Sequence, residues 1–289
     1  MINNNTFLPL EKGGEEGFSE SVLISMRPLI REILACKRHD SKDIAENSQE
    51  KSSRSGRVLE AWEPSTHGGF MTTALILLVA FVLLCAVLYF EKTQNRIGLV
   101  PAKGCLSLLF ILAALVQKDP LSPYIGFVVT GLVFCFGGEV FLSLPQKKAF
   151  MLGLISFLVG HVFYVIGFFS VAGFRGWTWV SLVLAGAISF LVYRWLRSHL
   201  GKMKGPVIGY MVVITVMVCA ASSVLAAADF SLSGRLMVFA GAVAFYFSDV
   251  FVARDRFMKN EFVNRLVGLP MYYAGQFLIA FSLGSLRLS

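Results

Sequence analysis

Charged residues are scarce in this chain. Lysine, arginine, aspartate and glutamate make up 15% of the 289 residues, whereas a soluble domain has about 25%. Hydrophobic residues reach 56%, and the mean hydropathy is +0.68. A water-soluble domain of this size could not cover so many apolar side chains. The composition therefore excludes a soluble globular fold and predicts an integral membrane protein.

Sequence motifs of metal sites and of nucleophilic hydrolases are also missing. The chain has no CxxC spacing, no HExxH motif and no GxSxG motif. Four of the five cysteines lie in apolar segments, where cysteine usually acts as a small buried hydrophobic residue. One histidine and two carboxylates could hold zinc, but no ligand spacing supports that interpretation. We therefore expect no metal and no cofactor.

The first 69 residues differ from the rest of the chain. They contain 9 basic and 11 acidic residues, whereas the remainder contains 17 and 7. We interpret 1–69 as a polar N-terminal tail without a cleavable signal peptide, largely flexible because of a low-complexity run over 41–57. An amphipathic helix over 18–36 that lies on the membrane surface is one interpretation of its apolar positions, and a tail without function is the other.

Long apolar segments follow the tail. Each is close to the ~20 residues that cross ~30 Å of hydrocarbon, and such a segment must be helical because lipid offers no partner to backbone groups. The predicted transmembrane helices cover Phe70–Phe90, Gly98–Val116, Tyr124–Leu142, Ala149–Val171, Trp177–Leu196, Pro206–Ala228, Ser233–Ala253 and Val267–Leu286. The sequence thus predicts an all-α polytopic membrane protein, with an eight-helix transmembrane domain over 70–289.

Basic residues are distributed unequally between the two ends of this predicted bundle. The loops after the first, third, fifth and seventh helices hold twelve lysines and arginines, and the loops at the opposite end hold four. The positive-inside rule places the basic loops in the cytoplasm. Lys51, Arg54 and Arg57 of the tail oppose that orientation.

The same loops decide which partners we expect. Lysines and arginines beside apolar spans meet lipid headgroups, so we expect membrane lipids and no nucleic acid as partners. The chain is predicted to be a multi-pass protein, of the cytoplasmic membrane in a bacterium. The oligomeric state stays open.

A few polar side chains interrupt the predicted helices. Lys103, Glu139, His161 and Asp249 are ionisable, and Gln276 lies at a similar depth. Each is costly in hydrocarbon, so each should face the bundle interior or water. Four of the five fall in the half nearer the basic loops, and the fifth is close to it. This convergence predicts one polar pocket open toward those loops.

Three tyrosines share a helix face with these polar residues. They form i,i+3 pairs, which are His161 with Tyr164, Tyr246 with Asp249, and Tyr273 with Gln276. Their hydroxyls could orient the polar groups. In the alternative interpretation, Lys103 and Asp249 extend to the interface, and His161 is a packing residue.

Glycines also mark one face of the fourth predicted helix. Gly153, Gly160 and Gly167 are seven residues apart and form a smooth stripe with Ala149 and Ser156. Such a stripe predicts a closely packed neighbouring helix.

Five segments of the apolar part carry recognisable motifs in a fixed order. They are Val100-Pro101-Ala102-Lys103, GLVFCFGGEVFLSLP at 131–145, VGHVFYVIGF at 159–168, FYFSDVFVARDRF at 245–257 and YYAGQFLIAFSLG at 272–284. Together they resemble the YhhN-like lysoplasmalogenase family of eight-span membrane proteins. The resemblance covers nearly all of 70–289 and leaves out the tail. Glu139 stands where family members usually carry aspartate, and the Pro-Ala-Lys order replaces Lys-Pro.

The resemblance implies an enzyme that hydrolyses the vinyl-ether bond of lysoplasmalogen. The products would be a fatty aldehyde and glycerophosphoethanolamine or glycerophosphocholine. Under this hypothesis Glu139 or Asp249 is the general acid, the other carboxylate stabilises the oxocarbenium ion, and His161 helps to activate water. Lys103 would meet the lipid phosphate. The other expected substrate-binding residues are Tyr164, Tyr246, Tyr273 and Gln276.

Two other functions are compatible with polar residues inside membrane helices. One is a carrier or channel for lipids or ions, although no inverted repeat or paired interrupted helix supports it. The other is a family member without catalysis that binds lipid.

Overall fold

The computed structural model describes residues 66–117 and 123–287, which are helical throughout except for short loops. The predictions for the tail, including the amphipathic helix over 18–36, lie outside the described residues. The long helices are α2 (Thr66–Thr93), α3 (Arg96–Leu115), α4 (Pro123–Ser143), α5 (Lys147–Ala172), α6 (Gly176–Leu196), α7 (Lys204–Leu225), α8 (Leu232–Phe257) and α9 (Phe262–Ser285). A short 3-10 helix, η1 (Gly201–Met203), precedes α7.

All eight predicted transmembrane helices are confirmed, since each of these helices is long and apolar enough to cross a membrane. The largest difference is at α9, which begins at Phe262 rather than Val267. The prediction treated Arg265 as a loop residue, but it lies inside the helix, where carboxylates from two other helices pair with it. An ion pair within the bundle thus lets a charged residue extend a membrane helix.

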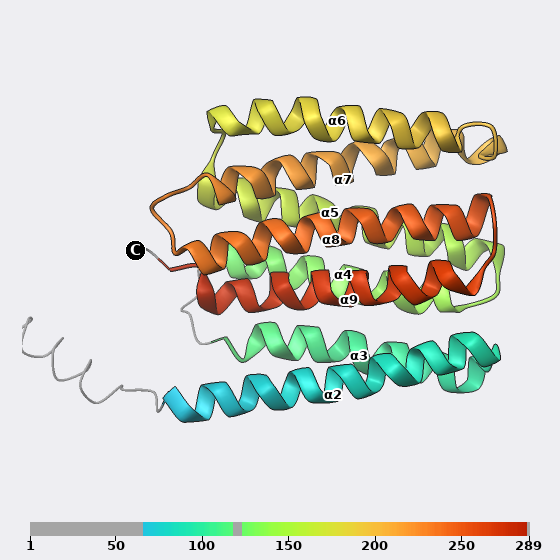
Figure 1. The fold of residues 1–289 in the computed structure, drawn as a ribbon, viewed down its shortest axis with the longest axis horizontal. Helices are drawn as coiled ribbons and strands as arrows, with labels where there is room; N and C mark the ends of the chain where they lie inside the picture. Colours follow the sequence, from blue (N-terminus) through green and yellow to red (C-terminus); the bar gives the residue numbers. More distant parts are fainter. Residues whose placement is uncertain (1–65, 118–122, 288–289) are drawn as a thin grey trace, which may run out of the picture. The chain divides into compact units, whose positions relative to one another are not determined.

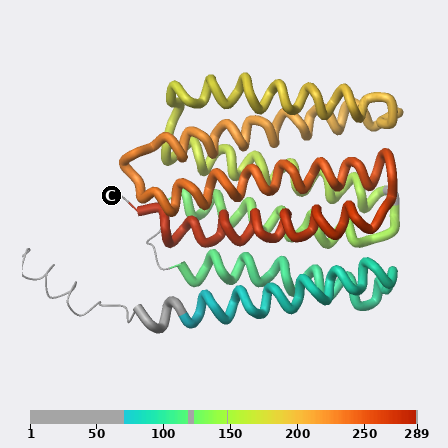
Figure 2. The backbone as a smooth tube through the Cα atoms, in the orientation of Figure 1, coloured from blue at the N-terminus to red at the C-terminus, as the bar shows by residue number. Residues whose placement is uncertain are grey.

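The helices of residues 69–289 lie side by side and alternate in direction (Figure 1). In this view α2 and α3 form one edge, and α6 and α7 form the other. Between them α8 packs against α9, α4 packs against α5, and α3 contacts both α4 and α9. The trace in Figure 2 shows that the loops α2–α3, α4–α5, α6–α7 and α8–α9 gather at the same end. We call this end, which carries the basic loops, the basic end.

The glycine stripe of α5 packs against α4, as predicted. A Cβ atom at Gly160 would lie 2.9 Å from Cys135 Sγ and 3.0 Å from the carbonyl oxygen of Gly131. A second close approach joins α8 to α9, where a Cβ atom at Gly241 would lie 2.9 Å from the carbonyl oxygen of Gly275. Small residues therefore allow the backbones of both helix pairs to touch.

The outer surface of the bundle is apolar. Leu75 and Phe81 of α2 are 61% and 65% exposed, and Trp177 and Val183 of α6 are 66% and 71% exposed. Hydrocarbon solvates such side chains and water does not, because lipid tails are as apolar as leucine. The chain is therefore an integral multi-pass membrane protein.

Candidate functional site

A cavity of about 320 Å³ opens at the basic end of the bundle. Residues of the α2–α3, α4–α5 and α8–α9 loops, among them Gln94, Pro145 and Asn260, line its mouth. Side chains from all the long helices line it. Those of α5, α6 and α7 are mainly apolar, and we call them the apolar wall. The charged ones come from α2, α3, α4, α8 and α9, and we call these the polar wall. We call this cavity the chamber. Its position agrees with the expected pocket open toward the basic loops.

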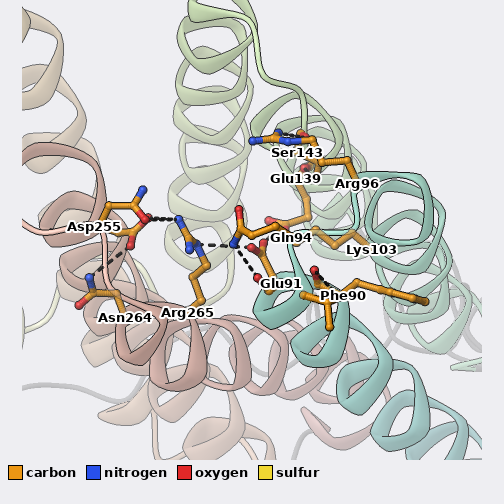
Figure 3. Close-up of polar contacts among 12 residues, drawn as sticks. Phe90, Glu91, Gln94, Arg96, Lys103, Glu139, Ser143, Asp255, Asn264 and Arg265 are labelled. Atoms are coloured by element: carbon orange, nitrogen blue, oxygen red, sulfur yellow. Dashed lines mark hydrogen bonds and ion pairs between the residues drawn. The ribbon is translucent and has the colours of Figure 1, made fainter.

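A buried lysine organises the polar wall of the chamber (Figure 3). Lys103 Nζ lies 2.9 Å from Glu139 Oε1 of α4 and 3.1 Å from Glu91 Oε1 of α2. The three residues are between 6% and 9% exposed. The Tyr273 hydroxyl also approaches Glu139 Oε1, at 3.5 Å.

The charged contacts continue across the basic end. Arg265 Nε lies 3.4 Å from Glu91 Oε2, and a terminal nitrogen of Arg265 lies 2.9 Å from Asp255 Oδ2. The amide of Asn264 donates to Asp255 Oδ1 at 3.3 Å, and it also donates to the backbone oxygen of Lys259. Figure 3 shows Glu91 between the lysine and the arginine.

These contacts form one chain of charges through five helices. Asp255 of α8, Arg265 of α9, Glu91 of α2, Lys103 of α3 and Glu139 of α4 follow one another in it. A buried charge without a partner destabilises the fold, so the loss of one member of this series leaves its neighbours as unpaired buried charges. Glu139 is the last member of this series of charges, and it lines the chamber.

Asp249 is a further carboxyl group on the chamber wall, and its surroundings differ from those of the ion-paired carboxylates. The Tyr210 hydroxyl of α7 donates a hydrogen bond of 2.6 Å to Asp249 Oδ2 of α8. Within the described ranges, no lysine or arginine forms an ion pair with Asp249. Four carboxyl groups thus line the chamber. Glu91, Glu139 and Asp255 are in ion pairs, whereas Asp249 is held by a phenol.

Hydroxyl groups surround Tyr246 beside this aspartate. The hydroxyl oxygens of Tyr246 and Ser189 are 2.7 Å apart, and Ser189 lies 2.6 Å from Thr215 Oγ1. The i,i+3 spacing predicted that Tyr246 and Asp249 share a helix face, and both residues line the chamber. The hydrogen bond to Asp249 comes from Tyr210, however, and the Tyr246 hydroxyl bonds to Ser189 of α6.

His161 lies within the bundle, behind the chamber wall. Its ring is fully buried, with the ring centroids of Phe245 and Tyr210 at 4.5 and 5.4 Å. Neither ring nitrogen has a hydrogen bond of acceptable geometry to the described residues. His161 is not among the residues that line the chamber, whereas Tyr210 and Asp249 are.

The other predicted polar residues form an interior layer. The Tyr164 hydroxyl donates to Gln276 Oε1 at 2.7 Å, and both side chains are fully buried. The predicted pairs Tyr164 with His161 and Tyr273 with Gln276 are therefore not hydrogen-bonded pairs. The structure brings Lys103, Glu139, Tyr246 and Asp249 together on the chamber wall. His161, Tyr164, Tyr273 and Gln276 lie behind that wall.

Sequence reasoning missed several residues of the chamber. Glu91 and Arg265 stand near the ends of apolar segments and were treated as loop charges, yet Glu91 is 9% exposed. Tyr210 follows six residues after the basic loop residue Lys204 and has no polar neighbour that would mark it. Glu91 lies two residues before the end of α2 and Lys103 seven residues after the start of α3, so their positions along the sequence gave no signal that they pair.

Asp249 and Glu139 can take part in acid–base chemistry together, because Asp249 can hold a proton while the ion pair with Lys103 holds Glu139 as an anion. No group of three or more His, Cys, Asp or Glu side chains in 66–117 and 123–287 is arranged to hold a metal ion. Arg96 and Arg256 are exposed and also line the chamber, so they can meet an anionic group at its mouth.

Comparison with known proteins adds independent information. A family model described as the YhhN family matches residues 99–283. The lysoplasmalogenase TMEM86A of Homo sapiens is 30% identical over 158 residues, which are 54% of this chain and 64% of that protein. The lysoplasmalogenase TMEM86A of Bos taurus is 30% identical over 162 residues, with the same shares covered. The matches thus span just under two thirds of these relatives. No solved structure matches.

Proposed function

Since this chain belongs to the YhhN family, we propose that it is a membrane-embedded hydrolase that cleaves the vinyl-ether bond of lysoplasmalogen. The relatives named lysoplasmalogenase support this substrate class. The observation that carries the proposal is the contrast between two carboxyl groups of one chamber. Glu139 is ion-paired with Lys103, whereas Asp249 has a phenol as its partner.

This contrast supports one choice between the two roles that the sequence left open. Glu139 is held as a carboxylate by the ammonium group of Lys103 at 2.9 Å. Asp249 forms no ion pair in the described part of the chain and is therefore the group that can carry a proton. Asp249 is the general acid in this proposal, and Glu139 stabilises the cationic intermediate.

The reaction consumes one water molecule and begins with the transfer of a proton from Asp249. Asp249 gives its proton to the outer alkene carbon, and the carbon bonded to the ether oxygen becomes an oxocarbenium centre. Water attacks this centre and returns a proton to Asp249. The hemiacetal then collapses to a fatty aldehyde and the alcohol of glycerophosphoethanolamine or glycerophosphocholine. The Glu139 carboxylate faces the positive charge while it exists.

Lys103 has a different role in this proposal from the one expected. Its ammonium group already contacts two carboxylates and is 6% exposed, so it holds Glu139 in place. Arg96 and Arg256 at the chamber mouth are the cations available to a phosphate group. His161 supports Tyr210 through ring contact, and its part in the reaction passes through that residue.

The test is turnover by purified protein in D₂O. Lysoplasmalogen and the corresponding 1-acyl lysophospholipid are supplied in parallel, with and without a chelator. We expect aldehyde from lysoplasmalogen alone, with one deuterium at the carbon next to the aldehyde group. Unlabelled aldehyde would contradict protonation of the alkene. No aldehyde, combined with movement of intact lipid across vesicles, would favour the transporter.

A further inference from the structure

A second hollow lies between α2, α3 and α9, away from the charged mouth of the chamber. It has a volume of about 610 Å³, and eleven of its fifteen lining residues are apolar. The other four are Thr73, Gln117, Tyr273 and Ser285, so no charged side chain lines it. We call this hollow the groove. Its lining excludes a path for ions and fits hydrocarbon.

The size of the groove restricts what can occupy it. It runs from Leu84 to Thr73 along α2, which is about 17 Å at 1.5 Å per residue. A helix about 10 Å wide and 17 Å long would fill roughly 1,300 Å³, about twice the available volume. A chain of about 16 carbons needs roughly 480 Å³ if each carbon takes about 30 Å³, close to the share of a water molecule. The volume of the groove therefore matches one hydrocarbon chain of this length and is too small to enclose another transmembrane helix.

One tyrosine connects the groove to the chamber. The ring of Tyr273 lines the groove, while its hydroxyl points to Glu139 Oε1 at 3.5 Å. Leu106, one turn after Lys103 in α3, lines the groove beside it and is fully buried. Tyr273 and Leu106 therefore form one layer of residues, with Glu139 of the chamber on one side of it and the groove on the other.

The depths of the two sites also agree. Glu139 is four residues from the basic end of α4, or about 6 Å along the helix. Ala80 and Ala274 line opposite walls of the groove. They are 13 and 12 residues from the basic ends of α2 and α9, or about 18–20 Å along each helix. An extended chain spans about 1.2 Å per bond, a third of one peptide repeat. A chain of about 16 carbons that starts near Glu139 passes this level, and one of about 8 carbons does not.

We propose that the groove between α2, α3 and α9 binds the alkenyl chain of the substrate, with Tyr273 at the junction between chain and reactive bond. This inference rests on the proposed function and adds the site that selects chain length. The groove does not gain affinity from burial, because the surrounding lipid is equally apolar. It acts by holding the vinyl ether in register with Glu139 and Asp249, so a blocked groove should lower kcat/KM.

Two substitutions block the groove from opposite walls. Ala80→Phe and Ala274→Phe each place a ring at the same depth, and Ala74→Phe is the matched control on α2. Ala80 is 8% exposed and lines the groove, whereas Ala74 is exposed and does not. For a lysoplasmalogen with about 16 chain carbons, we expect both blocking variants to lose about tenfold in kcat/KM. For a chain of about 8 carbons we expect no change, and none in Ala74→Phe with either substrate.

A second measurement does not depend on turnover. A saturated 1-O-alkyl lysophospholipid with a diazirine at the end of its chain is photolysed with the protein in nanodiscs, and adducts are mapped by mass spectrometry. Adducts on the groove residues of α2 and α9 that an excess of unlabelled alkyl lysophospholipid removes would support the groove even if wild-type protein released no aldehyde. The absence of aldehyde would contradict the proposed function and would leave the groove proposal standing.

Three results would overturn the groove proposal. One is labelling of the apolar chamber wall around Val192 and Met211 with the groove unlabelled. Another is groove labelling that diacyl lipid displaces as readily as the lysolipid, since an ordinary membrane lipid would then occupy it. The third is an equal loss of kcat/KM for long and short chains in the blocking variants.

Discussion

The Tyr210 hydroxyl lies 2.6 Å from Asp249 Oδ2, and it joins α7 to α8 on the chamber wall. Tyr210 is 8% exposed, and its ring packs against His161. The phenol thus fixes the position of the carboxyl group that the proposed reaction uses as its acid. Without this hydrogen bond the Asp249 side chain would be free to turn within the chamber.

Tyr210→Phe should therefore reduce kcat for lysoplasmalogen and leave KM nearly unchanged. A hydrogen bond to a charged or ionisable partner contributes about 1.5–3 kcal/mol, which corresponds to roughly a 10- to 100-fold loss of rate. Steady-state kinetics of aldehyde release measures both constants. Tyr193→Phe is the control, because Tyr193 is half-buried in α6 and does not line the chamber. Equal kinetics in the two variants would show that Tyr210 does not position the acid.

Lys103→Met should destabilise the protein strongly. It would leave Glu91 and Glu139 buried without their shared cation, and loss of one partner of a buried ion pair costs about 3–5 kcal/mol. Thermal unfolding in detergent measures the change, with the exposed Lys92→Met as control.

A double variant separates charge from packing at this position. Glu139→Gln added to Lys103→Met neutralises the carboxylate that loses its cation, whereas Glu91 keeps Arg265 at 3.4 Å. Part of the lost melting temperature should therefore return. A double variant less stable than Lys103→Met alone would contradict the charge chain as we describe it.

Gly241→Ala should loosen the contact between α8 and α9. Its Cβ atom would lie 2.8 Å from Ile279 Cγ1 and 2.9 Å from the Gly275 oxygen, so the helices must separate at a cost of about 1–3 kcal/mol. At Gly186 in α6 a Cβ atom meets nothing within 4 Å. Gly186→Ala should be neutral or slightly stabilising in the same unfolding assay. A similar loss in both variants would mean that general helix properties, not close contact, set the effect.

The sequence predicted the number and order of the transmembrane helices because length and apolar composition alone decide whether a helix can cross a membrane. It also predicted the depth of the polar residues, since depth follows from position along a helix. Depth does not give the direction in which a side chain points. His161 has the expected depth, but its ring packs against Phe245 and Tyr210 and is not among the residues that line the chamber.

Partners from distant helices were beyond prediction from one sequence. Glu91, Lys103 and Glu139 come from three helices, and nothing in their local spacing joins them. The i,i+3 rule finds neighbours on one helix, such as Tyr246 and Asp249, and it cannot find a hydrogen-bond donor on another helix, such as Tyr210 of α7. The family model begins at residue 99, so it does not contain Glu91 or the rest of α2 either.

Aldehyde release by Asp249→Asn tests the central claim most directly. Asparagine keeps the size of the side chain and can still accept the Tyr210 hydrogen bond, but it cannot give up a proton. Asp229→Asn at the other end of the bundle, where Asp229 pairs with Arg175, is the control. Both variants should elute as folded protein. We expect the control to turn over normally and Asp249→Asn to lose at least about 100-fold in kcat. Folded Asp249→Asn that releases aldehyde at the wild-type rate would contradict the account.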